Sequence, residues 1–415
     1  MNYRPISFLL GAGFSAPMGY PTGNVLNESL QNFHKFNVCV SPDGKMFAID
    51  KESKQTFYGN PYTIYLNCCI KLIEEYSKEN NFDYEEFFEF LAQKKYLSIP
   101  QYRELCSSFI TETVSLDYIS SNIEDIYNQM VSYLLKDGDN IVWYDNQPYH
   151  IGKIDKYDGF LSLLKDWAYN RITHIHTLNH DMLFESFNRT DYISGDICDG
   201  FEELGSNYYG KLELADGRTY NVRLERFTAN YTKNIRLYKL HGSLDYVLYH
   251  KTANDGISLI PEQYVKIKYG IGYDGLMRDT GSTEKYEEYP FAYHANFLTG
   301  TTSKIKKYED PFLFKPLFNL FKKNLEKSEM LIIIGYGCKD SGINDIIKKH
   351  FKGDKIFIVD PYCDKNKTVN EFGRSRKLMG INFYYPYKLR PLSYGNESIG
   401  SACTHRATFS NTGLF

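Results

Sequence analysis

The chain has 415 residues, 42% of them hydrophobic and 24% charged, and its formal net charge at pH 7 is −3. This composition is ordinary for a globular protein, and the small charge argues against direct binding to nucleic acid or to a membrane surface. No apolar run reaches the roughly 18 residues of a membrane span, so we expect a cytoplasmic protein.

The N-terminal segment predicts a strand, a glycine-rich turn and a helix. The apolar run Ile6–Leu10 leads directly into Gly11-Ala12-Gly13-Phe14-Ser15. Such a turn can cradle the pyrophosphate of a dinucleotide, because glycines let the backbone approach an anion and the helix start offers free N–H groups. Thr22 can cap the helix that follows the turn. The candidate binding residues here are Gly11, Ala12, Gly13, Ser15 and Thr22.

Hydrophobic periodicity divides the rest of the chain. It predicts a helical insertion over about 61–150 and a loop-rich, glycine- and tyrosine-rich insertion over about 251–311. The remaining parts of a domain spanning 1–395, about 1–36, 155–250 and 312–365, alternate strand and helix, and 396–415 reads as a tail. This alternation predicts an α/β fold: a Rossmann-like parallel sheet with helices on both faces, plus an inserted helical subdomain.

Polar or glycine residues follow each of the later predicted strands. These strand ends carry Asn179 and Asp181, then His241, then Gly335 and Gly337, and finally Asp360. Ligands of open α/β sheets bind at the carboxyl ends of the strands, so we expect all these groups to face one crevice together with the glycine turn.

Taken in order, these motifs resemble a known family. The segments GAGFS (11–15), TLNHD (177–181), KLHGS (239–243), IIIGYG (332–337) and IFIVD (356–360) are similar to the sirtuin-like NAD-consuming fold. The details look most like the bacterial anti-phage branch, whose members hydrolyse NAD. Three departures disfavour protein deacylation: no Phe-Arg pair follows the GYPTG loop (19–23), Leu178 stands in the glutamine place, and the zinc module is missing.

The resemblance implies an enzyme that cleaves NAD+ to nicotinamide and ADP-ribose and depletes NAD in abortive infection. It also implies a homo-oligomer and, as partner, a HerA-like hexameric ATPase or another protein of the defence system. The alternatives are an NAD-dependent deacylase or ADP-ribosyltransferase, and a non-catalytic module that senses NAD or ADP-ribose.

Each candidate residue has a functional and a structural interpretation. His241 is the candidate base, or else a hydrogen-bonded histidine at a strand end. Asn179 would bind the ribose hydroxyls or the attacking water, or else occupy a turn. Asp181 could equally cap a helix, and Asp360 could bind the adenosine ribose or simply form a turn before proline. Gly335 and Gly337 would allow the backbone to approach the adenosine half.

No metal is expected. His174 and His176 share one face of a predicted strand, and His180 follows it, but no further ligand is evident. The eight cysteines are scattered without a CxxC motif, which favours reduced thiols over a zinc module.

Overall fold

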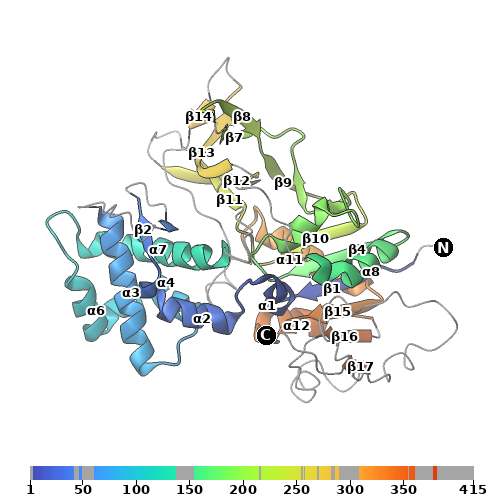
Figure 1. The fold of residues 1–415 in the computed structure, drawn as a ribbon, viewed down its shortest axis with the longest axis horizontal. Coiled ribbons are helices and arrows are strands. Elements are labelled where there is room, and N and C mark those ends of the chain that lie inside the picture. Colours follow the sequence, from blue (N-terminus) through green and yellow to red (C-terminus); the bar gives the residue numbers. More distant parts are fainter. Residues whose placement is uncertain are drawn as a thin grey trace.

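A seven-stranded parallel sheet occupies one side of the protein, on the right in Figure 1. The computed structural model describes residues 3–41, 46–48, 60–136, 154–214, 216–253, 256, 258–268, 271–281, 286–288, 308–353, 355–359 and 377–380. The strand order is β17-β16-β15-β1-β4-β10-β5. The strands are β1 (Ile6–Leu10), β4 (Thr173–Thr177), β5 (Ile197–Cys198), β10 (Ile235–Lys239), β15 (Met330–Ile334), β16 (Lys355–Val359) and β17 (Lys377–Gly380).

The order of the strands confirms the predicted Rossmann-like α/β fold. We leave out the two-residue β5 and number the other six strands along the chain. Read from β10 to β17, the sheet then has the order 3-2-1-4-5-6, which is that of the doubly wound nucleotide-binding folds. All the pairs in this sheet are parallel. The chain changes direction between β1 and β15, and this switch point is where such sheets bind their ligands.

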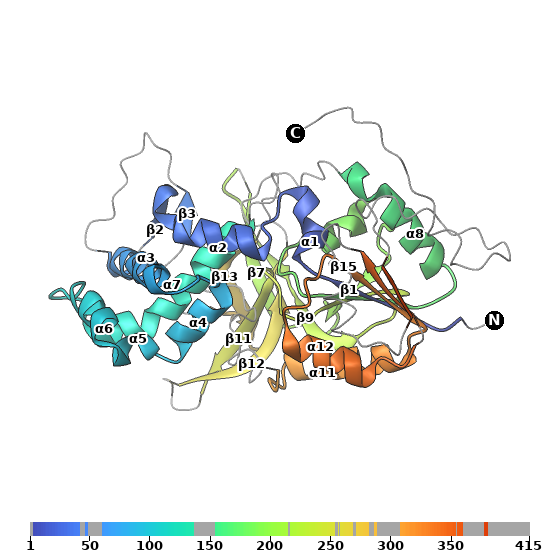
Figure 2. The same ribbon diagram turned by 90° about the horizontal axis from the view of Figure 1, so that it is seen from below.

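Helices cover both faces of this sheet, as Figure 2 shows. Phe8 of β1 packs on one face against Phe160 of α8 (Asp158–Ala168). Leu9 points to the other face, in the same cluster as residues of α11 (Phe314–Lys327) and α12 (Ser341–His350). Burial on both faces explains why β1 and β15 are apolar at almost every position.

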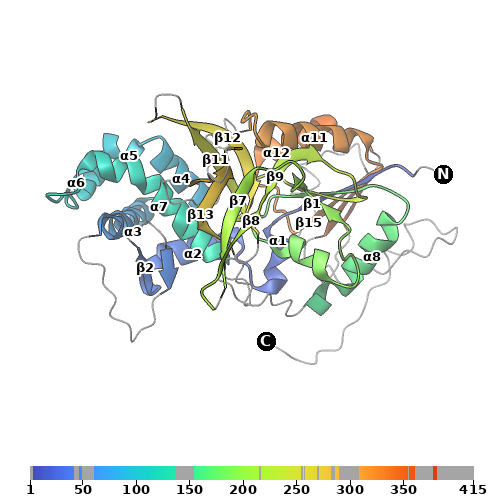
Figure 3. The same cartoon turned by 90° about the horizontal axis from the view of Figure 1, so that it is seen from above.

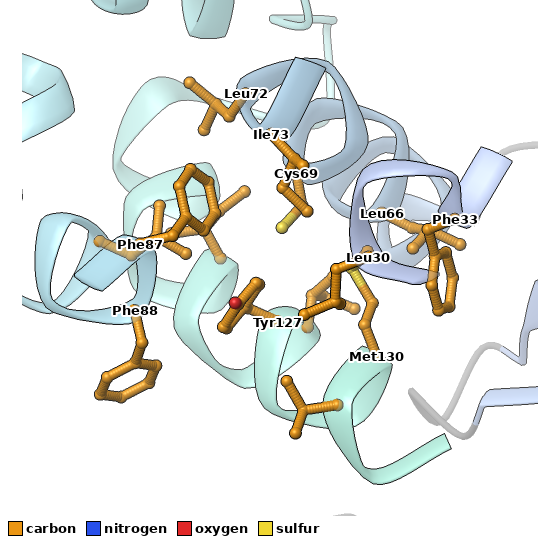
Figure 4. Close-up of a cluster of buried hydrophobic side chains, with 14 of the residues drawn as sticks. Leu30, Phe33, Leu66, Cys69, Leu72, Ile73, Phe87, Phe88, Tyr127 and Met130 are labelled. Carbon is orange, nitrogen blue, oxygen red and sulfur yellow. The ribbon is translucent and has the colours of Figure 1, made fainter. Parts of the chain in front are cut away.

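A helical unit lies beside the sheet. It contains α2 (Gly23–Gln31), α3 (Pro61–Glu79), α4 (Tyr84–Ala92), α5 (Lys95–Ser98), α6 (Pro100–Ser107) and α7 (Leu116–Lys136). Its core, shown in Figure 4, joins Leu30 and Phe33 to Leu72, Phe87 and Tyr127. We predicted α2 as part of the Rossmann-like core, but its apolar face packs here instead. The rest of the predicted insertion, 137–150, lies outside the described residues.

Antiparallel strands occupy the middle of the molecule along its long axis (Figure 3). One sheet has the order β11-β12-β9-β6 and another the order β14-β13-β7-β8. The strands are β6 (Gly200–Glu202), β7 (Tyr208–Glu213), β8 (Thr219–Arg223), β9 (Glu225–Asn230), β11 (Tyr246–Thr252), β12 (Leu259–Lys266), β13 (Ile271–Asp279) and β14 (Tyr286–Glu288); a separate pair joins β2 (Val38–Val40) to β3 (Met46–Ala48).

The strands β12, β13 and β14 lie where we predicted loops, over 251–311. Register shifts between Tyr249 and His250 and between Ile271 and Leu276 interrupt the ladders. Each shift moves the following side chains to the other face, so the sequence loses the regular alternation that reveals a strand. The tail predicted over 396–415 lies outside the described residues.

Two further features of the described residues concern the cysteines and the character of the helices. The cysteines Cys39, Cys68, Cys69, Cys106, Cys198 and Cys338 are free thiols. None of the helices that the structure describes combines the length and apolar character needed to cross a bilayer.

Candidate functional site at the carboxyl edge of the sheet

The strand register brings the predicted residues to one edge. Leu10 pairs with both Ile334 and Thr177, and Thr177 pairs with Lys239. Gly11 and Gly335 each come directly after one of two paired residues, Leu10 and Ile334. Asn179 and His241 each come two residues after the paired residues Thr177 and Lys239, so they occupy equivalent positions. Val359 pairs with Ile334, so Asp360 comes next in the chain, but it lies outside the described residues.

The glycines at the switch point pack against one another. Gly11 N–H donates to Ile334 O (2.9 Å), and Gly13 N–H donates to Gly335 O (3.0 Å). Gly335 has φ +63°, and a Cβ there would lie 2.4 Å from Gly13 C. These glycines therefore allow two turns of the protein itself to touch, and the two N–H groups that we assigned to a pyrophosphate already have backbone acceptors. Gly337 is exposed, and a Cβ there meets nothing within 4 Å.

The helix after the glycine turn is much shorter than predicted. It is the single turn α1 (Ala12–Ser15), which runs into a 3-10 turn over Ala16–Met18 and stops at Gly19 with φ +87°. Pro17 lacks the N–H that a continuing α-helix would need. A single turn aligns few peptide dipoles, so its start attracts an anion less than we expected. Thr22 is the N-cap residue of α2, without a capping side-chain hydrogen bond.

Asn179 is fixed by its amide nitrogen. Nδ2 donates to Gly11 O and to Ser15 Oγ, both at 2.9 Å. The buried Ser15 hydroxyl in turn hydrogen-bonds the Asp181 carboxylate. Asp181 Oδ1 also accepts the N–H of Leu183 at 3.0 Å, although the N-cap of the short helix α9 (Leu183–Ser186) is Met182 and not Asp181. Burial raises the pKa of Asp181, against the opposing effects of Lys239 and the Ser15 hydroxyl.

Lys239 is a site residue that the sequence analysis did not single out. Its ammonium is buried and lies 3.0 Å from Glu185 Oε1. Nζ also donates to the carbonyl oxygens of His180 (3.4 Å) and Asp181. The strand β10 thereby holds the backbone that follows Asn179. The signal in the sequence was a lysine at the end of a strand that is mostly apolar, because a buried lysine needs a partner for its charge.

His241 is buried and lies beside a carboxylate. Its exposed fraction is 5%, and Gly242, with φ +84°, turns the chain directly after it. His241 Nε2 lies 3.4 Å from Asp340 Oδ2, and the His180 ring centroid is 6.2 Å from that of His241. This arrangement provides an imidazole with a neighbouring negative charge at the edge of the sheet.

Asp340 is the second residue that sequence reasoning missed. It is the N-cap of α12, and its Oδ1 accepts the N–H of Ile343 at 3.1 Å. The neighbouring Ser341 is also of a residue type that caps helices well, but it is the first residue of α12. An aspartate directly before the apolar stripe of Ile343 and Ile347 was the signal available in the sequence.

The histidines of β4 belong to the core. His174 Nδ1 lies 3.1 Å from the Tyr238 hydroxyl, while His176 Nδ1 lies 3.0 Å from Phe8 O and its Nε2 3.2 Å from Asn324 Nδ2. Burial lowers the pKa of His174 to about 2 and that of His176 to about 3. Among the residues that the structure describes, no group of three His, Cys, Asp or Glu side chains could hold a metal ion.

Comparisons with known proteins yield only distant structural likenesses. No protein-family model matches the chain, and no curated protein matches it either. Two Sir2 homologue mutants solved with ADP-ribose are each 10% identical, cover 86% of this chain and 80% of their own, and superpose with a TM-score of 0.32. A triple mutant solved with 2′-O-acetyl ADP-ribose is 11% identical, covers 90% and 84%, and has a TM-score of 0.34. Such low scores establish neither fold nor activity, and the α/β assignment rests on the sheet itself.

Proposed function

We propose that the protein is an NAD+ hydrolase that cleaves the bond between nicotinamide and ribose, giving nicotinamide and ADP-ribose. The observation that carries the proposal is the placement of Asn179 and His241. They stand at equivalent positions after neighbouring parallel strands, beside the switch point of a sheet with Rossmann order. That edge is where nucleotides bind in such sheets.

For this reaction the protein must orient the ribose and the attacking water and supply one base. Cleavage passes through an oxocarbenium-like centre, as in glycoside hydrolysis, and nicotinamide leaves as a neutral molecule without an acid. His241 would take the proton from water or from a ribose hydroxyl. Both hydrogens of Asn179 Nδ2 have acceptors, so a ligand would meet Oδ1. This atom accepts from a ribose hydroxyl or from the attacking water.

The remaining candidate residues would bind the rest of the dinucleotide. Ala12 and Thr22 flank the glycine turn near the proposed pyrophosphate position. Exposed Gly337 leaves room for the adenosine half to approach the backbone. Asp360 follows β16 in the chain and would accept from the adenosine ribose hydroxyls. NAD+ is the substrate in this scheme, and no step needs a metal.

The biological role extends this proposal. From the motif resemblance, we propose that the enzyme depletes NAD during phage infection, as a homo-oligomer activated by a HerA-like ATPase. NAD levels measured in infected cells, with and without the gene, test the role. Unchanged NAD would contradict it even if the purified enzyme is active.

The decisive experiment follows NAD+ consumption by the purified chain. Nicotinamide and ADP-ribose are separated by chromatography, with and without the partner ATPase, for the wild type, His241→Ala and Asn179→Ala. Loss of a catalytic base slows a reaction by about 100-fold or more, and we expect such a loss in both variants. The control is His34→Ala, an exposed histidine in the 3-10 turn Phe33–Lys35.

Two results would contradict the proposal. The first is the absence of cleavage by the wild type with its partner; if NAD+ still binds, a sensing module is favoured. The second is cleavage that persists in both His241→Ala and Asn179→Ala, which would place the chemistry elsewhere in the protein.

A further inference from the structure

We infer that Asp340 is a positioning residue for His241: its carboxylate holds the Nε2–H form of the ring, so that Nδ1 is the nitrogen that takes the proton. The contact behind this inference is the 3.4 Å separation between His241 Nε2 and Asp340 Oδ2. The catalytic consequence rests on the proposed NAD+ hydrolysis, whereas the pairing itself does not.

The pairing joins strands that are not neighbours. His241 follows β10 and Asp340 follows β15, and β1 and β4 lie between these strands. Three strand spacings amount to about 14 Å. The segment from Gly335 to Asp340, which can extend by up to about 20 Å over six residues, covers this distance together with the two side chains.

Other contacts hold this segment in place. The Tyr336 hydroxyl is within hydrogen-bond distance of Asp340 O (3.0 Å) and Asn344 Oδ1 (2.9 Å). Asn344 Nδ2 donates to Cys338 O at 2.8 Å. Cys338 itself has φ +55°, a left-handed conformation that costs a non-glycine residue about 1–2 kcal/mol. The surrounding contacts therefore hold the backbone in a strained conformation, and this conformation positions the Asp340 carboxylate.

Several charged and polar groups surround the pair. Oδ1 accepts the Ile343 N–H at the positive end of α12, a ten-residue helix. Tyr308 also lies near Asp340, and burial, followed by the charge of Asp340, raises the pKa of this phenol. Tyr84 of α4 experiences the charge of Asp340, and Glu85 acts on Tyr308. The centroid of the His180 ring lies 6.2 Å from that of His241.

The position of the carboxylate selects the base nitrogen. A neutral imidazole carries one N–H, and a negative charge beside one nitrogen favours the tautomer with the N–H on that nitrogen. The nitrogen that faces the Asp340 carboxylate is Nε2, at 3.4 Å, so the proposed tautomer has its N–H on Nε2 and its lone pair on Nδ1. A proton from the ribose hydroxyl or from water then moves to Nδ1, and the Asp340 carboxylate stabilises the resulting imidazolium.

The variant Asp340→Asn separates this role from helix capping. Asparagine caps helices as well as aspartate does, so the Ile343 N–H keeps its acceptor while the charge is lost. The matched control is Asp83→Asn, because Asp83 caps α4 by accepting the N–H groups of Glu85 (3.0 Å) and Glu86 (3.3 Å). We expect both variants to melt at the wild-type temperature.

The first readout is nitrogen-15 NMR of the His241 ring without NAD+, assigned among the ten histidines with a His241→Gln sample. We expect the Nε2-protonated neutral form in the wild type. In Asp340→Asn, loss of the neighbouring charge should lower the titration midpoint of the ring by about 1 pH unit. In Asp83→Asn the midpoint should not move. The second readout is turnover, where Asp340→Asn should lower kcat about tenfold at an unchanged KM.

An Nδ1-protonated neutral ring in the wild type would overturn the inference, and this measurement stands even if Asp340→Asn does not fold. A midpoint and a kcat equal to those of the wild type in folded Asp340→Asn would overturn it as well, leaving Asp340 as a helix cap. A wild type that never cleaves NAD+ contradicts the proposed function, while the NMR result still decides the pairing.

Discussion

Gly335→Ala tests whether the glycine contact at the switch point is needed for the fold. At φ +63°, a Cβ would lie 2.4 Å from both Gly13 C and Phe14 N, which are backbone atoms that cannot rotate away. The left-handed conformation costs alanine about 1–2 kcal/mol, and overpacking adds about 1–3 kcal/mol. We therefore expect a loss of about 2–5 kcal/mol in the free energy of unfolding.

The matched control is Gly337→Ala, two residues later, where the added Cβ meets nothing within 4 Å. Its free energy of unfolding should stay within about 0.5 kcal/mol of the wild type, the usual range for surface changes. Urea denaturation followed by circular dichroism measures both. With about 2.1 cal/mol/K of unfolding entropy per residue, the loss in Gly335→Ala corresponds to a fall in Tm of about 2–6 °C for 415 residues. Equal stability of the two variants would refute the reasoning.

Two further predictions concern buried charge. Lys239→Met should lower the free energy of unfolding by about 3–5 kcal/mol, because it leaves the Glu185 carboxylate buried without its cation. The double variant Lys239→Met, Glu185→Leu should recover much of that loss. Urea midpoints that do not differ between the single and double variants would contradict this prediction. The pKa values of His174 (about 2) and His176 (about 3) are lowered in the native state, so the unfolded chain binds protons more readily. The contribution of the two neutral histidines to the free energy of unfolding is therefore fully present above the pKa of about 6.5 in the unfolded chain, and it is lost as the pH drops toward about 3. The contribution of the pair reaches about 2.7 kcal/mol per pH unit, and a His174→Gln, His176→Gln double variant should show a flatter dependence of the urea midpoint on pH.

The sheet could be predicted from the sequence because its strands are buried on both faces. The apolar run of β15 and the strand that leads into Gly11 have few other interpretations, and strands separated by helices imply parallel pairing. The predicted edge followed from this pairing. Hydrophobic periodicity shows which face of a helix is buried, but not the core in which that face packs. The apolar stripe of α2 predicted a buried face, but it did not predict packing against α3 and α7.

The parts of the site that were missed depend on the path of loops. Asp340 meets His241 only because the segment after Gly335 reaches past two strands, and no local pattern encodes that path. Gly335 illustrates a related limit. A glycine at a strand end indicates that some backbone comes close, and here it is the turn at Gly13 rather than a ligand.

The placement of α2 has a mechanical consequence. The helix is embedded in the helical unit, yet only Gly19–Thr22 separate it from the 3-10 turn that ends at Met18. Four residues stretch to at most about 14 Å, so this linker is a short tether. Any protein that pulls on the helical unit by more than the slack in that tether must also move the glycine turn. Force applied far from the sheet thus has a direct route to its switch point.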